Sequence, residues 1–271
     1  MSDIVLSSGV RSNLLQLQQT SDLISSTQTK LATGKRVNSA LDNANNFFTA
    51  QGLDNRASDL NNLLDAMSTA INTIQAANNG ITAITKLVQS AQSLASQAQQ
   101  TSDTAVRASL SSQFDSISTQ IDKLAADAGF NGKNLLNGDN LTVTLNEAAT
   151  SSVTITGVTD SSAGALAISA AANSWAASGD IDAASADLTA ALTTLRSQAQ
   201  TLGSSLSTVQ IRQDFTKAMI NTLQAGSDSL TLADSNQEGA NLLALQTRQQ
   251  LSTTALSLAS QADQNVLKLF Q

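Results

Sequence analysis

The side chains that most often carry out chemistry in enzymes are scarce in this sequence. It contains no His and no Cys, so the usual ligands of Zn²⁺, haem and iron–sulfur clusters are missing. Serine is abundant, but a serine nucleophile needs a base, usually His, and no Gly-x-Ser-x-Gly motif is present. The carboxylates are mostly Asp and are dispersed, so no pair suggests acid–base catalysis. We therefore predict a protein that is not an enzyme and that has no catalytic residues, metal or cofactor.

A pattern that favours self-association does occur, at both ends of the chain. The final segment, 249–271, repeats apolar residues at intervals of three and four, which is the periodicity of one helix face. A more polar repeat of the same kind covers residues 6–31. Because each stripe is otherwise exposed, we expect the two terminal helices to meet. The stripes consist of Leu251, Ala255, Leu258, Ala262, Val266 and Leu269 with Phe270 beside them, and of Leu6, Val10, Leu14, Leu17, Ser21, Ile24, Gln28 and Leu31.

A pair of terminal helices gains too little free energy from burial to be stable by itself. About eight large apolar side chains contribute roughly 1.5–3 kcal/mol each when fully buried. Ordering about sixty terminal residues costs roughly 1–2 kcal/mol per residue, and backbone hydrogen bonds recover only part of this. We therefore expect both ends to be largely disordered in a monomer and ordered by neighbouring copies. The alternative is a bundle formed within one chain.

The composition indicates long helices and excludes several classes of protein. The chain of 271 residues has no Pro, 41% hydrophobic residues and only 3% aromatic residues, which suits long uninterrupted helices in a narrow bundle. Its formal net charge is −7 and its Lys and Arg residues are scattered singly, so nucleic-acid binding is not expected. No signal peptide of the classical type and no membrane-length apolar run are present, which predicts a soluble protein outside the general secretory route.

Periodicity and turn signals divide the chain into expected elements. We predict helices over about 6–31, 42–99, 105–128 and 181–223, with Gly34 ending the first and Asn38 or Ser39 capping the second. Thr101-Ser102-Asp103 is expected to form a turn and cap before the third. Asn79-Gly80 is a weak point in the second helix, and Gly226 is a possible break before the terminal helix.

The middle of the sequence predicts a small β-structure. Alternation with a period of two predicts a hairpin of strands 141–146 and 153–156, joined by a loop around Ala149, after a Gly-rich turn region. Residues 159–184 read as a small exposed region in which Trp175 serves as a packing anchor.

The predicted fold class is mainly α. A long antiparallel helical bundle or coiled coil is formed by the N- and C-terminal segments, with a small β-hairpin insert in mid-sequence. Three domains are expected. Residues 1–40 with 228–271 form an inner coiled coil, residues 41–138 with 181–227 form a helical rod, and residues 139–180 form a small, exposed, variable insert.

Short motifs near both ends resemble those of bacterial flagellins, and in particular the short flagellins of alphaproteobacteria. The resemblance covers the chain to about Leu136 and from about Ile181, but not the insert. Asn43 departs from the family pattern, which has Asp there. The matching motifs are Gly34, Arg36-Val37-Asn38-Ser39-Ala40, Asp42-Asn43-Ala44, Phe130-Asn131-Gly132, and Gln264-Asn265-Val266-Leu267 with Leu269.

The resemblance implies a structural subunit that self-assembles into the extracellular filament of a flagellum and serves motility. It implies secretion through the flagellar export apparatus and partners that include an export chaperone, hook-associated proteins and the cap protein, besides further copies of the chain. It also places Arg36, Asn38 and Ser39 at a joint between domains. The expected filament-core interface is Leu14, Leu17, Ile24, Leu31, Leu251, Leu258, Val266, Leu269 and Phe270.

One alternative within the same family and one departure from it remain open. A hook–filament junction protein shares the flagellin ends and is the alternative function.

Enteric flagellins carry charged residues on their first long helix, where an animal Toll-like receptor recognises them. Here the corresponding positions are uncharged, which predicts weak or absent activation of that receptor. These positions are Ser90, Gln92 and Ser93, with Gln113 at a further one.

Overall fold

The computed structural model describes residues 8–269, and at 263 and 266–269 it describes the backbone alone. The chain forms two compact units. The first contains residues up to Asn55 and from Thr222, and the second contains Arg56–Asn221. Two long helices, α2 (Ala40–Gln99) and α4 (Ser178–Thr231), contribute to both units. The mainly helical fold expected from the sequence is confirmed, whereas the division into three domains stays a prediction.

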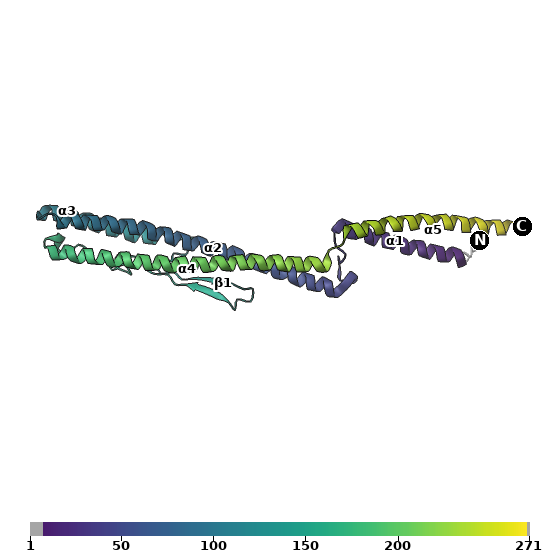
Figure 1. Ribbon diagram of the computed structural model, residues 1–271, viewed down its shortest axis with the longest axis horizontal. Helices are drawn as coiled ribbons and strands as arrows, with labels where there is room; N and C mark the ends of the chain where they lie inside the picture. Colours follow the sequence, from purple (N-terminus) through teal and green to yellow (C-terminus); the bar gives the residue numbers. More distant parts are fainter. Residues whose placement is uncertain (1–7, 270–271) are drawn as a thin grey trace. The chain divides into compact units, whose positions relative to one another are not determined.

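In the first unit, the terminal helices α1 (Ser8–Thr33) and α5 (Ser235–Leu269) pack side by side and run antiparallel (Figure 1). Helix α1 ends where expected, because Gly34 adopts a φ of +68° that reverses the chain without a steric penalty. The predicted meeting of the two ends is therefore confirmed.

Helix α2 begins directly after Ser39, one of the two residues predicted as its cap, but its first turn is irregular. The backbone is extended at Asn43, which interrupts the first turn of the helix. The side-chain oxygen Asn43 Oδ1 accepts a hydrogen bond from the N–H of Asn46 at 3.0 Å. Asn43 is thus the N-cap of the long helical segment that follows, because it satisfies an N–H that has no partner within the helix.

The junction between α4 and α5 also differs from the prediction. Helix α4 continues through Gly226 to Thr231 instead of breaking there. A Cβ at position 226 would lie 3.3 Å from Leu53 Cδ1, so this glycine allows close packing. The break comes at Leu232–Asp234, where the Asp234 carboxylate accepts hydrogen bonds from the N–H groups of Asn236 and Gln237 at the start of α5.

The second unit is a helical bundle around one apolar core. Helices α2 and α4 run alongside α3 (Thr104–Asp127), whose N-terminus is capped by Asp103 as expected. Large side chains from all three helices are fully buried in the core, among them Met67, Ile74, Ile84, Phe114, Ile121, Leu188 and Leu195.

Gly80, the weak point suggested by the sequence, is a site of close packing on α2. The helix is continuous there, and Gly80 is buried against the turn region that follows α3. A Cβ at this position would lie 2.6 Å from Leu136 Cδ1 and 2.7 Å from Ala128 Cβ. The absence of a side chain therefore lets these two residues approach the helix backbone.

The predicted hairpin is present and covers part of the bundle. Strands β1 (Leu141–Thr144) and β2 (Ser152–Ile155) pair antiparallel, with Val143 opposite Val153. The loop between them turns at Ala149, whose φ is +54°, as the sequence suggested. Val143 and Ile155 are buried, so the hairpin packs one face on the helices (Figure 1).

The segment 159–177 lies against the helices, and most of its residues are exposed. Three of its apolar side chains are buried, namely Leu166, Ile168 and Trp175. Trp175 ends a short 3-10 helix, η1 (Ala172–Trp175), and its ring centroid lies 5.1 Å from that of Phe114. Its predicted role as a packing anchor is confirmed.

Carboxylates on the helices hold the main chain of this segment. On α3, Asp122 accepts the N–H of Ser162 at 2.6 Å and its hydroxyl at 3.0 Å. Also on α3, Asp115 accepts the N–H of Ala171 at 2.9 Å. On α4, Asp187 accepts the N–H of Ser169 at 3.1 Å. Dispersed Asp residues therefore attach the segment to the bundle.

Candidate functional site

The contact between α1 and α5 follows a heptad pattern on both helices. Buried and half-buried side chains recur at intervals of three and four, as in a coiled coil. We call these two rows the inner seam. They are Val10, Asn13, Leu17, Thr20, Ile24, Thr27 and Leu31 on α1, and Glu238, Leu242, Leu245, Gln249, Ser252, Leu256 and Ala259 on α5.

The inner seam is unusually polar for a coiled coil. Thr20 is only 2% exposed and Thr27 only 6% exposed, although each is a polar residue. The Thr20 hydroxyl donates a hydrogen bond to the carbonyl of Gln16 at 2.8 Å, within the same helix. At one end of the seam, Lys30 and Glu238 form an ion pair with Nζ and Oε1 4.0 Å apart. Such a seam buries little apolar area, so it contributes little to the stability of the helix pair.

A second apolar row on α5 lies outside the inner seam. Leu243, Leu251 and Leu258 are each exposed by about two thirds. Several of its residues line a shallow groove together with Arg248. We call this row the outer stripe of α5. It consists of Ala240, Leu243, Ala244, Thr247, Leu251, Ala255, Leu258 and Ala262, all of which are exposed.

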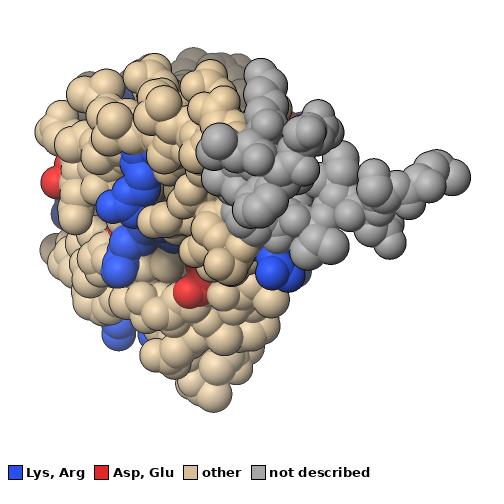
Figure 2. Space-filling view, turned by 90° about the vertical axis from the view of Figure 1, so that its right-hand side faces the viewer, with Lys and Arg blue, Asp and Glu red and all other residues tan. Residues whose placement is uncertain are grey.

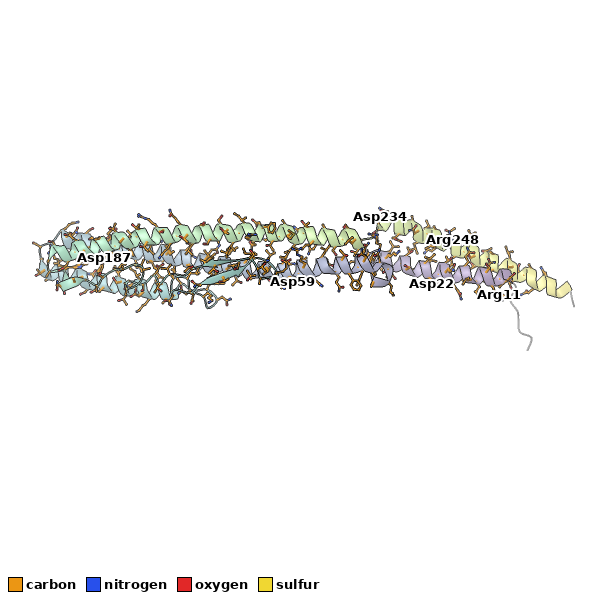
Figure 3. The ribbon with its side chains drawn as sticks, turned by 90° about the horizontal axis from the view of Figure 1, so that it is seen from below. Arg11, Asp22, Asp59, Asp187, Asp234 and Arg248 are labelled. Carbon is orange, nitrogen blue, oxygen red and sulfur yellow. The ribbon has the colours of Figure 1, made fainter. Side chains whose placement is uncertain are left out.

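Helix α1 also leaves apolar side chains uncovered, and few charges accompany them. Leu15 and Leu23 are about half exposed. Arg11 and Asp22 lie apart along α1, and Arg248 lies on α5 (Figure 3). The surface drawn in Figure 2 is likewise mostly uncharged. Exposed leucines with sparse charge are typical of a surface that another protein covers.

The connections beside the terminal helices are held together by backbone hydrogen bonds. The N–H groups of Arg36 and Val37 both donate to the carbonyl of Thr231, at 2.8 and 3.3 Å. In return, the N–H of Ala233 donates to the carbonyl of Gly34 at 2.9 Å. This short antiparallel bridge fixes the end of α1 next to the start of α5, and Val37 is buried beneath it.

The residues expected at a joint have identifiable contacts in this connection. The Arg36 guanidinium donates to the carbonyl of Ser229 at 3.5 Å, near the C-terminal end of α4. The Asn38 side chain donates to the carbonyl of Lys35. The N–H groups of Asn38 and Ser39 donate to the Asp42 carboxylate, and these bonds lower the pKa of Asp42. All of these contacts lie inside the first unit, so a role between domains stays a prediction.

The predicted filament-core residues fall into three groups. Leu17, Ile24 and Leu31 belong to the inner seam, where they are half buried. Leu14, Leu251 and Leu258 are exposed, and the latter two belong to the outer stripe. Val266 and Leu269 lie on α5 at positions where only the backbone is described, and Phe270 lies outside the described residues.

The four uncharged positions related to receptor recognition lie on the helices of the second unit. Ser90 and Ser93 are exposed on α2, and Gln92 is half buried there. The Ser93 hydroxyl donates to the carbonyl of Gln89 within the helix. Gln113 is exposed on α3.

Hydrophobicity alone did not reveal the whole inner seam. Thr20 and Thr27 were missed because the residues Leu14, Ser21 and Gln28 fit the same spacing shifted by one position. A regular heptad count from Val10 would have found both threonines. Asn43 was also missed. An Asn whose side chain accepts the backbone N–H of the residue three positions later is a typical N-cap, and here that residue is Asn46.

No metal or membrane site is found in the described part of the chain. Among residues 8–269, no group of three or more His, Cys, Asp or Glu side chains could hold a metal ion. None of the described helices is long and apolar enough to cross a bilayer.

Comparison with known proteins identifies both ends of the chain. Residues 8–141 match the bacterial flagellin N-terminal helical region, and residues 186–270 match the bacterial flagellin C-terminal helical region. Between them, the two matches cover most of the chain and leave out the middle segment that contains most of the insert.

Individual relatives match over shorter stretches. Flagellin A of Rhizobium meliloti strain 1021 is 42% identical over 65 residues, which are 24% of this chain and 16% of that protein. Flagellin of Brucella melitensis biotype 1 is 37% identical over 65 residues, or 24% of this chain and 23% of that protein. The matched stretch therefore spans less than a quarter of either relative.

A solved structure and the family matches complete the comparison. The crystal structure of Bacillus cereus flagellin has a TM-score of 0.47 and 18% sequence identity, covering 57% of this chain and 88% of that chain. The N-terminal region of the family matches the first part of the chain and the C-terminal region matches its last part, which is the order expected for one flagellin chain. The chain belongs to the bacterial flagellins.

Proposed function

We propose that this chain polymerises into a flagellar filament that serves motility, with its terminal helices forming the inner layer. The observation that carries the proposal is the outer stripe of α5, an uncovered apolar row within the region that matches the flagellin C-terminal model. A neighbouring copy that covers the stripe would remove its leucines from water.

The free energy available from this contact is substantial. Three leucines of the outer stripe are about two thirds exposed, and covering each would contribute roughly 1–2 kcal/mol. The exposed leucines of α1 add contributions of the same size. Since the inner seam is polar and thin, these lateral contacts supply the stability that the pair of helices lacks.

The polar residues of the inner seam suit a filament that changes shape. Thr, Gln and Ser side chains exchange hydrogen bonds over small displacements, whereas interdigitated large apolar side chains resist sliding. We propose that this polarity lets neighbouring subunits shift slightly between filament states.

We propose three regions with different roles in the assembled filament. Residues 1–40 with 228–271 form the inner layer, residues 41–138 with 181–227 surround it, and residues 139–180 face outward. The core interface comprises Leu14, Leu17, Ile24, Leu31, Leu251, Leu258, Val266, Leu269 and Phe270. Arg36, Asn38 and Ser39 fix the connection beside α1, and their backbone and side-chain bonds support this role.

Further partners follow from family membership. We propose that the chain is exported by the flagellar secretion apparatus with a chaperone, and that it meets hook-associated proteins and the cap protein during assembly. Nucleic acid and membrane are not proposed as partners.

The substitution Leu258→Asp tests the proposal. It places a charge in the outer stripe, where an unpaired buried charge would cost several kcal/mol per subunit. We expect the purified full-length variant to lose the ability to polymerise from seeds. Sedimentation and electron microscopy measure this. Export of the protein into the medium should continue, while swimming stops.

Ser257→Asp is the matched control. It adds the same charge one residue away on the same helix, at an exposed position that is a member of neither the inner seam nor the outer stripe. We expect this variant to polymerise. Circular dichroism should show equal helix content in both monomers. Normal filaments from Leu258→Asp would contradict the proposed contact.

Copy number distinguishes the alternative within the family. A filament subunit makes up the bulk of sheared surface filaments, whereas a hook–filament junction protein occurs there in few copies. Quantitative mass spectrometry of sheared filaments therefore separates the two functions.

A further inference from the structure

A carboxyl group in the second unit is buried without a charged partner. Asp160 is 0% exposed and lies just after β2, where the chain begins its path back across the helices. It lines a pocket of about 110 Å³. The other residues of this pocket are Leu135, Leu136, Thr156, Val158, Ser197, Gln198, Thr201 and Leu202, none of which is ionisable in the physiological range.

Asp160 and Gln198 are joined by one hydrogen bond and leave two acceptors unsatisfied. The amide nitrogen Gln198 Nε2 donates to Asp160 Oδ1 at 2.7 Å. The remaining oxygen atoms, Asp160 Oδ2 and Gln198 Oε1, are buried and have no hydrogen-bond partner among the described residues. Both are acceptors when the carboxyl group is ionised, so this arrangement lacks a proton donor.

We propose that Asp160 takes up a proton in mildly acidic solution while the insert is docked, and that this proton on Oδ2 is donated to Gln198 Oε1. The carboxylic acid and the amide then form a ring with two hydrogen bonds, in which every polar atom of the pair is satisfied. One proton thus resolves both unsatisfied acceptors. The pair is a pH-sensitive latch between the insert and α4, and it does not depend on polymerisation.

The electrostatic surroundings favour the neutral acid. Burial raises the pKa of Asp160 to about 6, and the hydrogen bond from Gln198 opposes this shift only in part. The carboxylates on neighbouring segments are engaged elsewhere, since Asp139 accepts the N–H of Asn134 and Asp122 accepts the N–H of Ser162. On α4, Arg196 is exposed.

The direction of the pH dependence follows from proton linkage. The pKa of Asp160 is higher in the folded state than its ordinary value of 3.8, so the folded protein binds the proton more tightly. The latch stabilises the fold fully below the ordinary pKa. This contribution is lost as the pH rises through about 6.

The backbone beside the latch reports its state. The N–H of Asp160 donates to the carbonyl of Leu136 at 2.8 Å, and that of Val158 donates to the carbonyl of Leu135 at 2.7 Å. Ionisation of Asp160 leaves two buried acceptors facing each other, so hydrogen exchange at these two amides should quicken relative to the helix cores.

The test compares wild type with Asp160→Asn in the full-length chain. Asparagine keeps the acceptor for Gln198 Nε2 and offers an N–H to Gln198 Oε1, but it does not titrate. Between about pH 7.5 and about pH 5, the folding equilibrium constant of the wild type should rise about tenfold from this site alone. The constant of Asp160→Asn should lack this rise.

Two features of the chain make the measurement specific. Trp175 is the only tryptophan and is buried in the same unit, so its fluorescence follows urea unfolding there. Asp59→Asn is the matched control, because Asp59 is an exposed aspartate on α2 in this unit (Figure 3). This variant should keep the rise seen in the wild type.

A second measurement compares infrared pH-difference spectra of wild type and Asp160→Asn. At about pH 5 the wild type should show an additional C=O stretch of a protonated carboxyl group, above the band that the other carboxyl groups give in both proteins, and this additional band should fade by about pH 7.5. Absence of this band, or an equal pH dependence in wild type and Asp160→Asn, overturns the proposal. In that case Asp160 is ionised throughout and a water molecule supplies the missing hydrogen bonds.

Discussion

Replacing Gly80 by Ala should destabilise the second unit, although alanine is the better helix former. Within a helix, alanine is favoured over glycine by about 0.5–1 kcal/mol. Here the added methyl group would lie 2.6 Å from Leu136 Cδ1 and 2.7 Å from Ala128 Cβ, closer than real contacts allow. Leu136 is only 2% exposed and has little room to turn away. The Cβ of Ala128 moves only with its backbone, so α2 and the turn after α3 must separate.

The size of the effect follows from these opposing contributions. Overpacking of a filled core typically costs about 1–3 kcal/mol. After subtraction of the gain in helix propensity, Gly80→Ala should lower the free energy of unfolding by roughly 0.5–2 kcal/mol.

Gly203→Ala supplies the control for helix propensity. Gly203 lies on α4 in the same unit, and a Cβ there would have no neighbour within 4 Å. This variant should raise the free energy of unfolding by about 0.5–1 kcal/mol. Urea unfolding followed by Trp175 fluorescence measures both variants. If Gly80→Ala stabilises the protein as much as Gly203→Ala does, the close approach of Leu136 and Ala128 is not real.

Two further predictions concern other parts of the chain. Asn43→Ala should remove the cap of the long segment of α2, costing about 1 kcal/mol and quickening hydrogen exchange at the Asn46 amide. Asn43→Asp should retain protection there, and equal exchange in all three proteins would argue against the cap. We also expect weak or absent activation of the flagellin-sensing Toll-like receptor in a reporter assay, since Ser90, Gln92, Ser93 and Gln113 carry no charge for charge-assisted contacts. Full potency in that assay would refute this expectation.

The sequence was sufficient for the helices whose ends carry local signals. Gly34 and Asp103 act within a few residues of their own position, so the end of α1 and the start of α3 could be predicted. The hairpin was predictable for the same reason, because alternation and the turn at Ala149 are local.

The packing of two glycines and the docking of the insert depend on residues that are far away in the sequence. Gly80 contacts Leu136 and Gly226 contacts Leu53, and neither contact is visible from the glycine's neighbours. The docking of residues 159–177 likewise depends on carboxylates on α3 and α4. Composition suggested an exposed loop because short runs of Ala and Ser carry no periodicity.

The sequence predicted that the terminal helices pack together, but it did not predict which row of residues on each helix forms the contact. Apolar stripes at both ends indicated packing between the termini, which the structure contains. Helix α5, however, has two rows with the same spacing, and only the neighbouring helix determines which of them is covered. Leu251 and Leu258 were therefore assigned to a core, yet in one chain they lie on the outer stripe.

The way the helices hold the insert has a consequence for its tolerance of change. Asp115 and Asp187 accept main-chain N–H groups, which every residue except proline offers. Nearby residues such as Ala163, Ala165 and Ala170 are exposed to solvent, and their side chains have no part in this attachment. This stretch can thus exchange its outward side chains while its path across the helices is preserved.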